Sequence, residues 1–139
     1  MTTRGLEPVV QDGQVVRSGE ILRLFKDEVI NSTTISYTSP SLMIGAFRHF
    51  LLHLDIDSTS TPTTLRVEVQ FGSDITKRWH TFKQDLFASL YWEDTDVASG
   101  VQECFQGLCA GRLFRIKLTG AGVDSTKYFT VSASVEFFN

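Results

Sequence analysis

The sequence predicts an all-β protein, an antiparallel jelly-roll-like β-sandwich with an extended N-terminal arm. Several segments alternate apolar and polar residues with a period of two, which is typical of strands with one buried face. Turn-forming residues separate these segments, and no long segment has the roughly 3.6-residue apolar period of a helix. Many short strands without helical crossovers indicate a sandwich or barrel. We expect an arm at residues 1–20 and one β-sandwich domain at residues 21–139.

The first twenty residues differ from the rest of the chain. Pro8 and three glycines interrupt any regular element, whereas Leu6, Val9 and Val10 are more apolar than an idle linker requires. Two interpretations stay open. The segment is either an ordered edge packed on its own sandwich, or an arm that lies across a neighbouring subunit and orders when it binds.

The segments that follow the arm include several weaker strand candidates. Residues 19–31 fit either a strand or a short helix, because their apolar positions suit both. Residues 33–38 are rich in β-branched side chains and residues 79–82 are aromatic, which favours a short strand in each place. The stretch 86–111 fits a long loop or strands in irregular register.

Four segments alternate clearly enough to predict a buried face. They lie at residues 50–56, 65–71, 114–118 and 129–137, and Ser/Thr/Pro- or Gly-rich turns separate them. The expected inward-facing residues are Phe50, Leu52, Leu54 and Ile56; Leu65, Val67, Val69 and Phe71; Phe114, Ile116 and Leu118; and Phe129, Val131, Ala133, Val135 and Phe137.

The charge pattern argues against nucleic-acid and membrane partners. The formal net charge is -3, and the basic residues are scattered among acids instead of clustered. No apolar secretory segment follows the first residues, and no run approaches the roughly 20 apolar residues that cross a bilayer. We therefore expect a protein made in a cytoplasm.

The two cysteines and the histidines do not predict a metal site. Cys104 and Cys109 are expected to be free thiols in a reducing cytoplasm. They flank a possible hairpin tip, so a cross-strand disulfide remains an alternative in an oxidising medium. His49 and His53 lie on one predicted strand, where four steps separate them by roughly 13 Å, too far to share one ion.

Searches for catalytic and cofactor motifs also give no candidate. The acidic residues near Asp55 and Asp57 lack the glycine and glutamate of a calcium loop, and a second acidic cluster at residues 93–96 has no defined spacing to them. The chain has no Gly-x-Ser-x-Gly motif, and the glycine-rich residues 120–122 lack the Lys-Ser/Thr of a phosphate loop. We expect no catalytic residue, no cofactor and no small-molecule substrate.

Apolar residues on outward faces indicate protein contacts instead. Phe137 and Phe138 are adjacent, as are Tyr91 and Trp92, and adjacent residues of a strand face opposite sides. One member of each pair should leave the core and meet a partner. The predicted contact residues are Leu6, Val9, Val10, His49, Leu51, His53, Tyr91, Trp92, Leu113 and Phe138.

The order of segments from about residue 33 to residue 139 resembles the small jelly-roll virion proteins of tailed bacteriophages, such as capsid decoration (cement) proteins. The resemblance rests on the sequences YTSP at 37–40, LHLDI at 52–56, LRVEVQ at 65–70, GRLFRI at 111–116 and FTVSASV at 129–135. It implies a homodimer or homotrimer in the virion that clamps adjacent copies of the major capsid protein.

The sequence therefore predicts a non-enzymatic virion structural protein, most simply a capsid decoration protein. One alternative is a head–tail or tail component of a phage. Another, of a different class, is a carbohydrate-binding sandwich module that uses Trp79, Tyr91 or Trp92 as a stacking platform.

Overall fold

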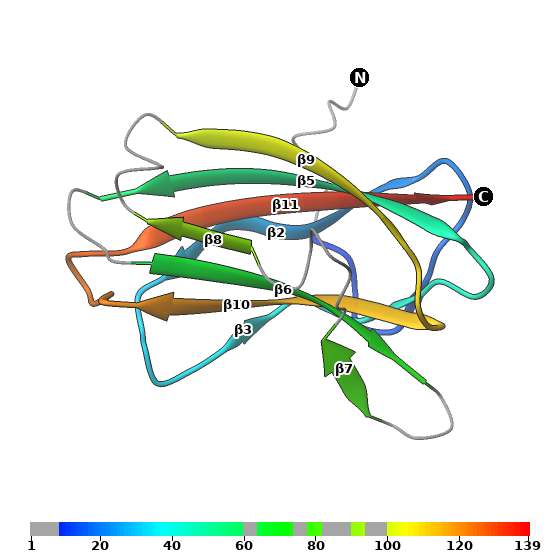
Figure 1. Cartoon of the computed structure of the whole chain (residues 1–139), viewed down its shortest axis with the longest axis horizontal. Helices are drawn as coiled ribbons and strands as arrows, with labels where there is room; N and C mark the ends of the chain where they lie inside the picture. The colour runs from blue at the N-terminus through cyan, green and yellow to red at the C-terminus, as the bar shows by residue number, and fades with distance from the viewer. Residues whose placement is uncertain (1–8, 60–63, 74–77, 82–89, 94–99) are drawn as a thin grey trace.

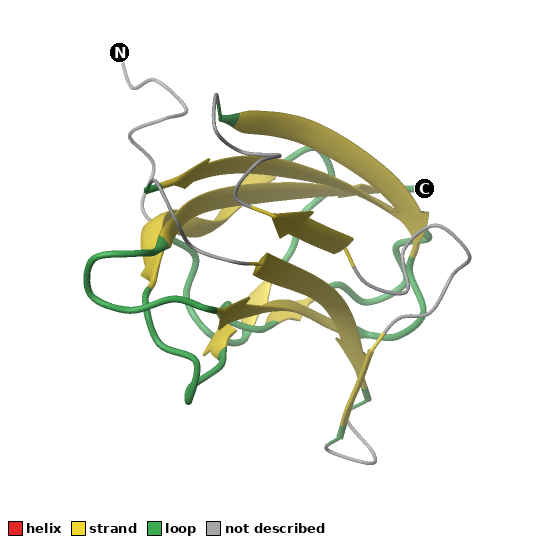
Figure 2. Cartoon of the chain, turned by 60° about the vertical axis from the view of Figure 1, so that its left-hand side comes forward, coloured by secondary structure: helices red, strands yellow, loops and turns green. Residues whose placement is uncertain are grey.

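A computed structural model describes residues 9–59, 64–73, 78–81, 90–93 and 100–139, with the backbone alone for 90–93. The described chain is all β, with two sheets packed as a β-sandwich (Figures 1 and 2). The strands are β1 (Gln14–Val15), β2 (Ile21–Ile30), β3 (Tyr37–Thr38), β4 (Leu42–Met43), β5 (His49–Ser58), β6 (Thr64–Gly72), β7 (Trp79–Thr81), β8 (Leu90–Glu93), β9 (Val101–Leu108), β10 (Leu113–Ala121) and β11 (Phe129–Phe138).

The four-stranded sheet has the order β2-β11-β5-β9, and all of its pairs are antiparallel. The seven-stranded sheet has the order β1-β4-β10-β6-β7, with β3 also on β10 and β8 also on β6. Its pairs are antiparallel except for β1 with β4, which run parallel. The chain repeatedly crosses between the sheets, so neighbours within a sheet are seldom neighbours in sequence.

The core lies between the two sheets and matches the predicted alternation. Every inward residue expected from the four clear segments is buried, with at most 4% of its surface exposed. Five phenyl rings form a cluster at one end of this core. They belong to Phe47, Phe50, Phe71, Phe114 and Phe137, with centroid separations of 5.0–6.2 Å. Offset and edge-on ring pairs of this kind add stabilisation beyond the area they bury.

The ambiguous segments resolve into strands with irregularities. Residues 21–30 form a strand, not a helix, and the pairing of β2 with β11 shifts register near Val131. Asp27 has a φ of 48°, and its backbone N–H bonds to the Ser132 hydroxyl at 2.9 Å. A second register shift, between Ala133 and Ser134, leaves Leu24 as an extra residue, so both Leu24 and Phe25 face the core and the regular alternation is lost from the sequence.

The structure changes the lengths of the other strands that the sequence predicted less clearly. The strand expected at residues 33–38 is confined to Tyr37–Thr38, because residues 33–36 belong to an exposed loop. The strand expected at residues 79–82 is present as Trp79–Thr81, and residue 82 lies outside the described residues. The open stretch 86–111 contains two strands, β8 and β9.

Residues 9–20 are tied to the sandwich by backbone hydrogen bonds. The Val10 N–H donates to the Arg23 carbonyl at 3.0 Å, and the Val16 N–H donates to the Met43 carbonyl at 3.0 Å. Asp12 accepts hydrogen bonds from both the N–H and the hydroxyl of Ser41, at 2.8 and 2.7 Å. This segment therefore runs from β2 of one sheet to β4 of the other.

Candidate functional site

Four predicted contact residues meet on the outer face of the four-stranded sheet. β5 places His49, Leu51 and His53 on this face, and the register places Phe138 of β11 opposite His49. The His49 and Phe138 rings stack with centroids 5.3 Å apart and planes inclined by 19°. All four side chains are half-buried. Residues that are far apart in the sequence thus form one partly apolar patch.

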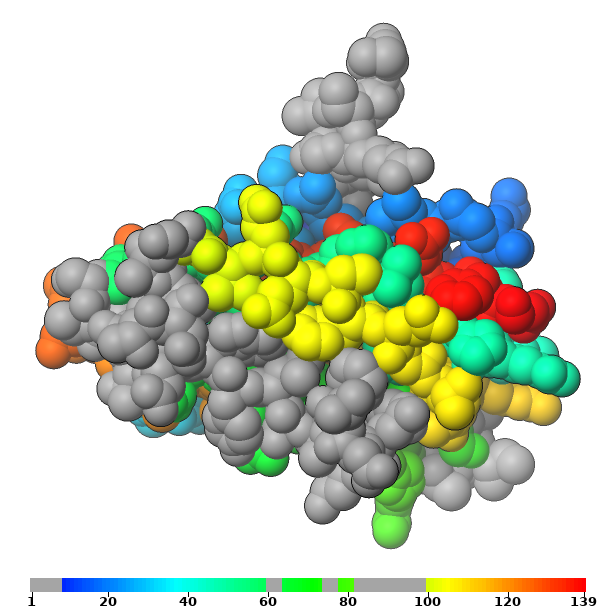
Figure 3. Space-filling view, turned by 45° about the horizontal axis from the view of Figure 1, so that its top comes forward, coloured from blue at the N-terminus to red at the C-terminus, as the bar shows by residue number. Residues whose placement is uncertain are grey.

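Leu108 of β9 extends this patch and was not predicted. It lies opposite His49 in the sheet and is 50% exposed. The sequence hides β9 because Glu103 and Gly107 occupy positions that pair with the buried Leu54 and Phe50, where apolar residues are expected. Figure 3 looks onto this face, with β9 in yellow beside β5 and the end of β11 in red.

His53 lies between a carboxylate and a thiol on the same face. Its Nε2 is 3.6 Å from Glu136 Oε1, and Cys104 of β9 lies opposite it in register. A cysteine beside a histidine is the arrangement of a thiol nucleophile, but these residues lie on an open sheet face and line neither cavity described below. Within the described ranges, no group of three or more His, Cys, Asp or Glu residues could hold a metal ion.

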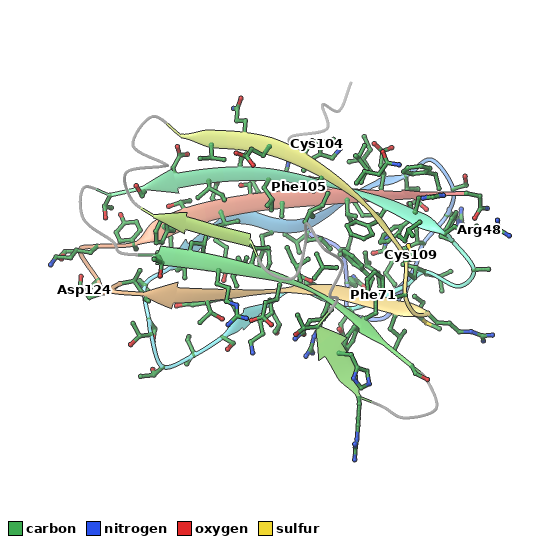
Figure 4. All side chains as sticks on the ribbon, in the orientation of Figure 1. Arg48, Phe71, Cys104, Phe105, Cys109 and Asp124 are labelled. Carbon is green, nitrogen blue, oxygen red and sulfur yellow. The ribbon has the colours of Figure 1, made fainter. Side chains whose placement is uncertain are left out.

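The two cysteines are free thiols, as expected, and the possible hairpin tip between them is not formed. Residues 101–108 form one continuous strand, so Cys104 and Cys109 are separated by on the order of 15 Å of extended chain. A disulfide needs Cα atoms within about 7 Å. Cys104 is exposed, whereas burial raises the pKa of the Cys109 thiol to about 12. Figure 4 shows the two side chains apart on the sandwich.

A second apolar row crosses the outer face of the seven-stranded sheet. The register aligns Val15, Met43 and Leu113 side by side, and then Gly72 and Trp79. Val15 is 65% exposed and Met43 is 40% exposed, while Leu113 and Trp79 are half-buried. Leu113 was predicted as a contact residue. Val15 and Met43 were not, because only the pairing of β1 with β4 brings them together.

Trp79 is held against its own sheet. A Cβ on Gly72 would lie 3.2 Å from the indole, so the ring packs directly over this glycine. The Arg115 guanidinium carbon lies 4.3 Å from the ring centroid, in a cation–π arrangement. Arg115 also donates a 2.8 Å hydrogen bond from Nε to Gln70 Oε1, which fixes its position. One face of the indole is therefore occupied by the guanidinium.

An open groove of about 380 Å³ lies where the second apolar row ends at Val15 and Met43. Its walls include the exposed Val15 and Met43 and the half-buried Phe47, with Arg112 also lining it. The groove residues are Val15, Val16, Met43, Ile44, Gly45, Ala46, Phe47 and Arg112. Hydrogen bonds from the Ile44 N–H to the Arg112 carbonyl and from the Phe47 N–H to the Ile44 carbonyl hold its walls.

The patch at His49 and Leu108, the apolar row of the seven-stranded sheet and the groove lie at one end of the sandwich, which we call the apolar end. Two short connections place these strand ends together, because residues 44–48 join β4 to β5 and residues 109–112 join β9 to β10 across the two sheets. The apolar end is defined by Val15, Met43, Leu108, Leu113 and Phe138. Three exposed arginines, Arg17, Arg48 and Arg112, lie around it. Arg48 marks this end in Figure 4.

The opposite end carries carboxylates, and we call it the acidic end. It is defined by Asp55, Asp57 and Asp124, and Asp124 marks it in Figure 4. Asp55 and Asp57 line a polar cavity of about 270 Å³ together with Gly100 and Gln102. Hydrogen bonds from the Thr126 N–H and hydroxyl, at 2.8 and 2.9 Å, and from the Lys127 N–H lower the pKa of Asp124, which closes a turn.

The remaining predicted contact residues have separate locations. Val10 is buried in the core of its own sandwich, so its side chain is not available to a partner, whereas Val9 is 39% exposed. Leu6 lies outside the described residues. Tyr91 and Trp92 lie on β8, which pairs with β6, and their side chains are outside the described part.

Comparisons with protein-family models, with curated proteins and with solved structures give no match for this chain. Across the part of the chain that the structure describes, no helix is long and apolar enough to span a bilayer.

Proposed function

We propose that this protein is a non-enzymatic structural component of a virion, a capsid decoration protein that binds copies of itself and the major capsid protein. The observation that carries the proposal is the apolar end. Outward apolar residues of both sheets, which alternation alone would not require, lie at this end, and two of them, Val15 and Met43, line a groove. Exposed apolar area of this kind, bordered by charged residues, is typical of a protein-contact surface.

The strand order supports a jelly-roll arrangement within the sandwich. The sheet β2-β11-β5-β9 faces a sheet in which β4, β10 and β6 are neighbours and β7 and β8 follow β6. The chain passes from β2 to the other sheet at β3 and β4, returns at β5, crosses to β6, and later alternates through β9, β10 and β11. Two such interleaved antiparallel halves are the pattern of jelly rolls, which occur in viral capsid proteins.

Repetition suits a contact surface of this modest size. A few half-buried apolar side chains give a weak single contact, but many copies on a lattice bind through several contacts at once. Weak, repeated contacts therefore stabilise a shell without a large or deeply apolar interface on each chain.

The alternatives differ in what the surface contacts. A head–tail or tail component would use the same apolar end, and the position in the particle separates it from a decoration protein. A carbohydrate-binding module needs an exposed aromatic face, and the guanidinium of Arg115 occupies one of the two faces of Trp79. We therefore favour a protein partner.

The proposal is tested by locating the protein in purified particles by electron microscopy, with its mass in solution measured alongside. We expect ordered copies on the capsid surface and an oligomer in solution. A strictly monomeric protein that joins no particle and binds polysaccharide would overturn the proposal. Ordered copies found only on the tail would replace the decoration role with the tail alternative.

Two matched variants sharpen this test. Leu51→Lys and Thr130→Lys each add one positive charge to the outer face of the four-stranded sheet, the first near the apolar end and the second at the acidic end. Leu51→Lys should lower occupancy on particles, and Thr130→Lys should not. Both should keep the unfolding temperature of the wild type, which separates lost contacts from lost folding.

A further inference from the structure

We propose that the groove at the apolar end binds residues 1–8 of a second copy of this chain, with Leu6 in the apolar part and Glu7 beside Arg112. The inference rests on the proposed function, because it names the contact through which copies associate. It concerns the groove, Leu6, Glu7 and Arg112, and it does not depend on which part of the particle the protein occupies.

The groove has the chemistry of a site for one apolar side chain. Val16 and Ile44 are buried beneath it, and Val15, Met43 and Phe47 form its walls. Two of the lining residues are small, Gly45, which has a φ of 58°, and Ala46. A space of about 380 Å³ with such walls accommodates a leucine and the extended backbone on either side of it.

Arg112 supplies the charge that selects the next residue. Its side chain is exposed and lines the groove, and no ion pair joins it to any acid among the described residues. A guanidinium beside an apolar wall favours a carboxylate that follows an apolar residue. Within residues 1–8, Glu7 is the only acidic residue, and it directly follows Leu6.

The chain around Pro8 favours a neighbour's groove over its own. Glu7 precedes Pro8, and a residue before proline is restricted to extended conformations. The Val10 N–H is bonded to the Arg23 carbonyl of β2, so the arm starts from a fixed point. Residues 10–15 already run from that point to the edge of the groove, so an arm docking on its own chain would have to reverse at Val9 and retrace them.

The restriction before Pro8 also favours binding. A residue that the following proline restricts to extended conformations loses less conformational freedom when it binds, and strand-like segments bind neighbouring surfaces in this way. The exposed Val9 joins this arm to the folded sandwich.

Charge exchange in the full-length chain tests the proposal. Glu7→Arg and Arg112→Glu should each weaken self-association by roughly 10-fold, because each places like charges at the contact. A one-to-one mixture of the two variants should restore association close to the wild-type strength, since each arm then meets an opposite charge on the other chain. Sedimentation equilibrium measures the association, and native mass spectrometry of isotope-labelled chains identifies mixed oligomers.

Two further variants serve as controls. Leu6→Asp should weaken association on the order of 100-fold, because it places an unpaired charge in the apolar groove. Arg48→Glu changes an exposed arginine of the same end that does not line the groove, and it should leave association unchanged. All variants should unfold at the wild-type temperature.

The outcomes separate this inference from the proposed function. Oligomers that persist in all three groove and arm variants would overturn the arm contact and leave the decoration role intact. Variants that weaken association without recovery in the mixture would also overturn docking on a neighbour, because an arm bound to its own groove gains nothing from mixing. A wild-type chain that is monomeric at all concentrations would reject the arm contact itself.

Discussion

The two ends of the sandwich are built from the same strands but differ in chemistry inside and outside. At the apolar end the core contains five clustered phenyl rings, and the outer faces carry Leu108, Met43 and Val15. At the acidic end the core is largely aliphatic around Phe129, and the outer positions carry aspartates beside the exposed Val29 and Ile35. Alternation decides which residues face inward. The outward positions are free of that constraint, and their contrast is the best indication of which end meets a partner.

The difference between the two ends of the core predicts the largest effects, which are on the free energy of unfolding. Phe114→Ala should lower the free energy of unfolding by about 3–5 kcal/mol, because it empties a buried phenyl site. Phe114→Leu should cost about 1–2 kcal/mol more than Phe129→Leu, since Phe114 contacts three other rings and no described ring contacts Phe129. Urea denaturation measures each loss. Equal losses in the two leucine variants would show that the phenyl cluster has no special contribution.

Two glycines near the ends of β9 give the next comparison. At the apolar end, a Cβ on Gly107 would lie 2.6 Å from the ring of Phe50, so Gly107→Ala should cost about 1–3 kcal/mol. At the acidic end, Gly100 has a φ of 83° and its nearest side-chain neighbour is the flexible Asp57, so Gly100→Ala should cost only about 1 kcal/mol. Thermal unfolding checks both, and a neutral Gly107→Ala would contradict the close packing of β9 on Phe50.

Exposed apolar residues at the two ends should affect association differently. Leu108→Ser and Met43→Ser, at positions 50% and 40% exposed, should each weaken self-association by about 5- to 10-fold. Ile35→Ser, in the loop at the acidic end and 53% exposed, should not change it. All three should alter the free energy of unfolding by less than about 0.5 kcal/mol. If Ile35→Ser dissociates the oligomer as strongly, the apolar end is not the distinctive contact.

The smallest expected effect is on how the free energy of unfolding changes at low pH. Hydrogen bonds, first from the backbone of Thr126 and of Ser41 respectively, lower the pKa of Asp124 and of Asp12 below the ordinary value of 3.8. A lowered folded-state pKa contributes stability above about pH 4, which is lost as the pH falls through that pKa. Asp124→Ala and Asp12→Ala should therefore each flatten the loss of stability below pH 4. Unfolding curves measured from pH 2 to pH 6 give the free energy of unfolding at each pH. If its slope against pH is unchanged in both variants, these carboxylates do not contribute to the acid sensitivity.

The sequence predicted the strands whose two faces differ cleanly, and it was less reliable where local geometry breaks the period. β5, β10 and β11 follow their alternation almost residue by residue, whereas in β6 the polar Glu68 and Gln70 are buried along with the apolar residues between them. β2 was ambiguous because its bulge turns Leu24 and Phe25 to the same side. β9 was hidden because Glu103 and Gly107 occupy inward-pairing positions, and for the same reason a hairpin between the cysteines was left open as a possibility.

The candidate surface depended on pairings that no local pattern encodes. His49, Leu51 and His53 share one strand face, so their grouping followed from alternation alone. The row containing Val15 and Met43 exists only because β1 pairs in parallel with β4. Such a contact joins residues 28 positions apart, and the register that creates it is set by tertiary packing and not by either segment.

The strand order also has a consequence for how the protein is made. β10 lies between β4 and β6, and β11 lies between β2 and β5, yet both follow all of these partners in the chain. During synthesis, β2 to β9 must therefore wait without the central strand of either sheet until β10 and β11 have left the ribosome. Pairing between distant segments is slow and exposes apolar edges meanwhile. We expect nascent chains of this protein to depend on chaperones until β11 is inserted.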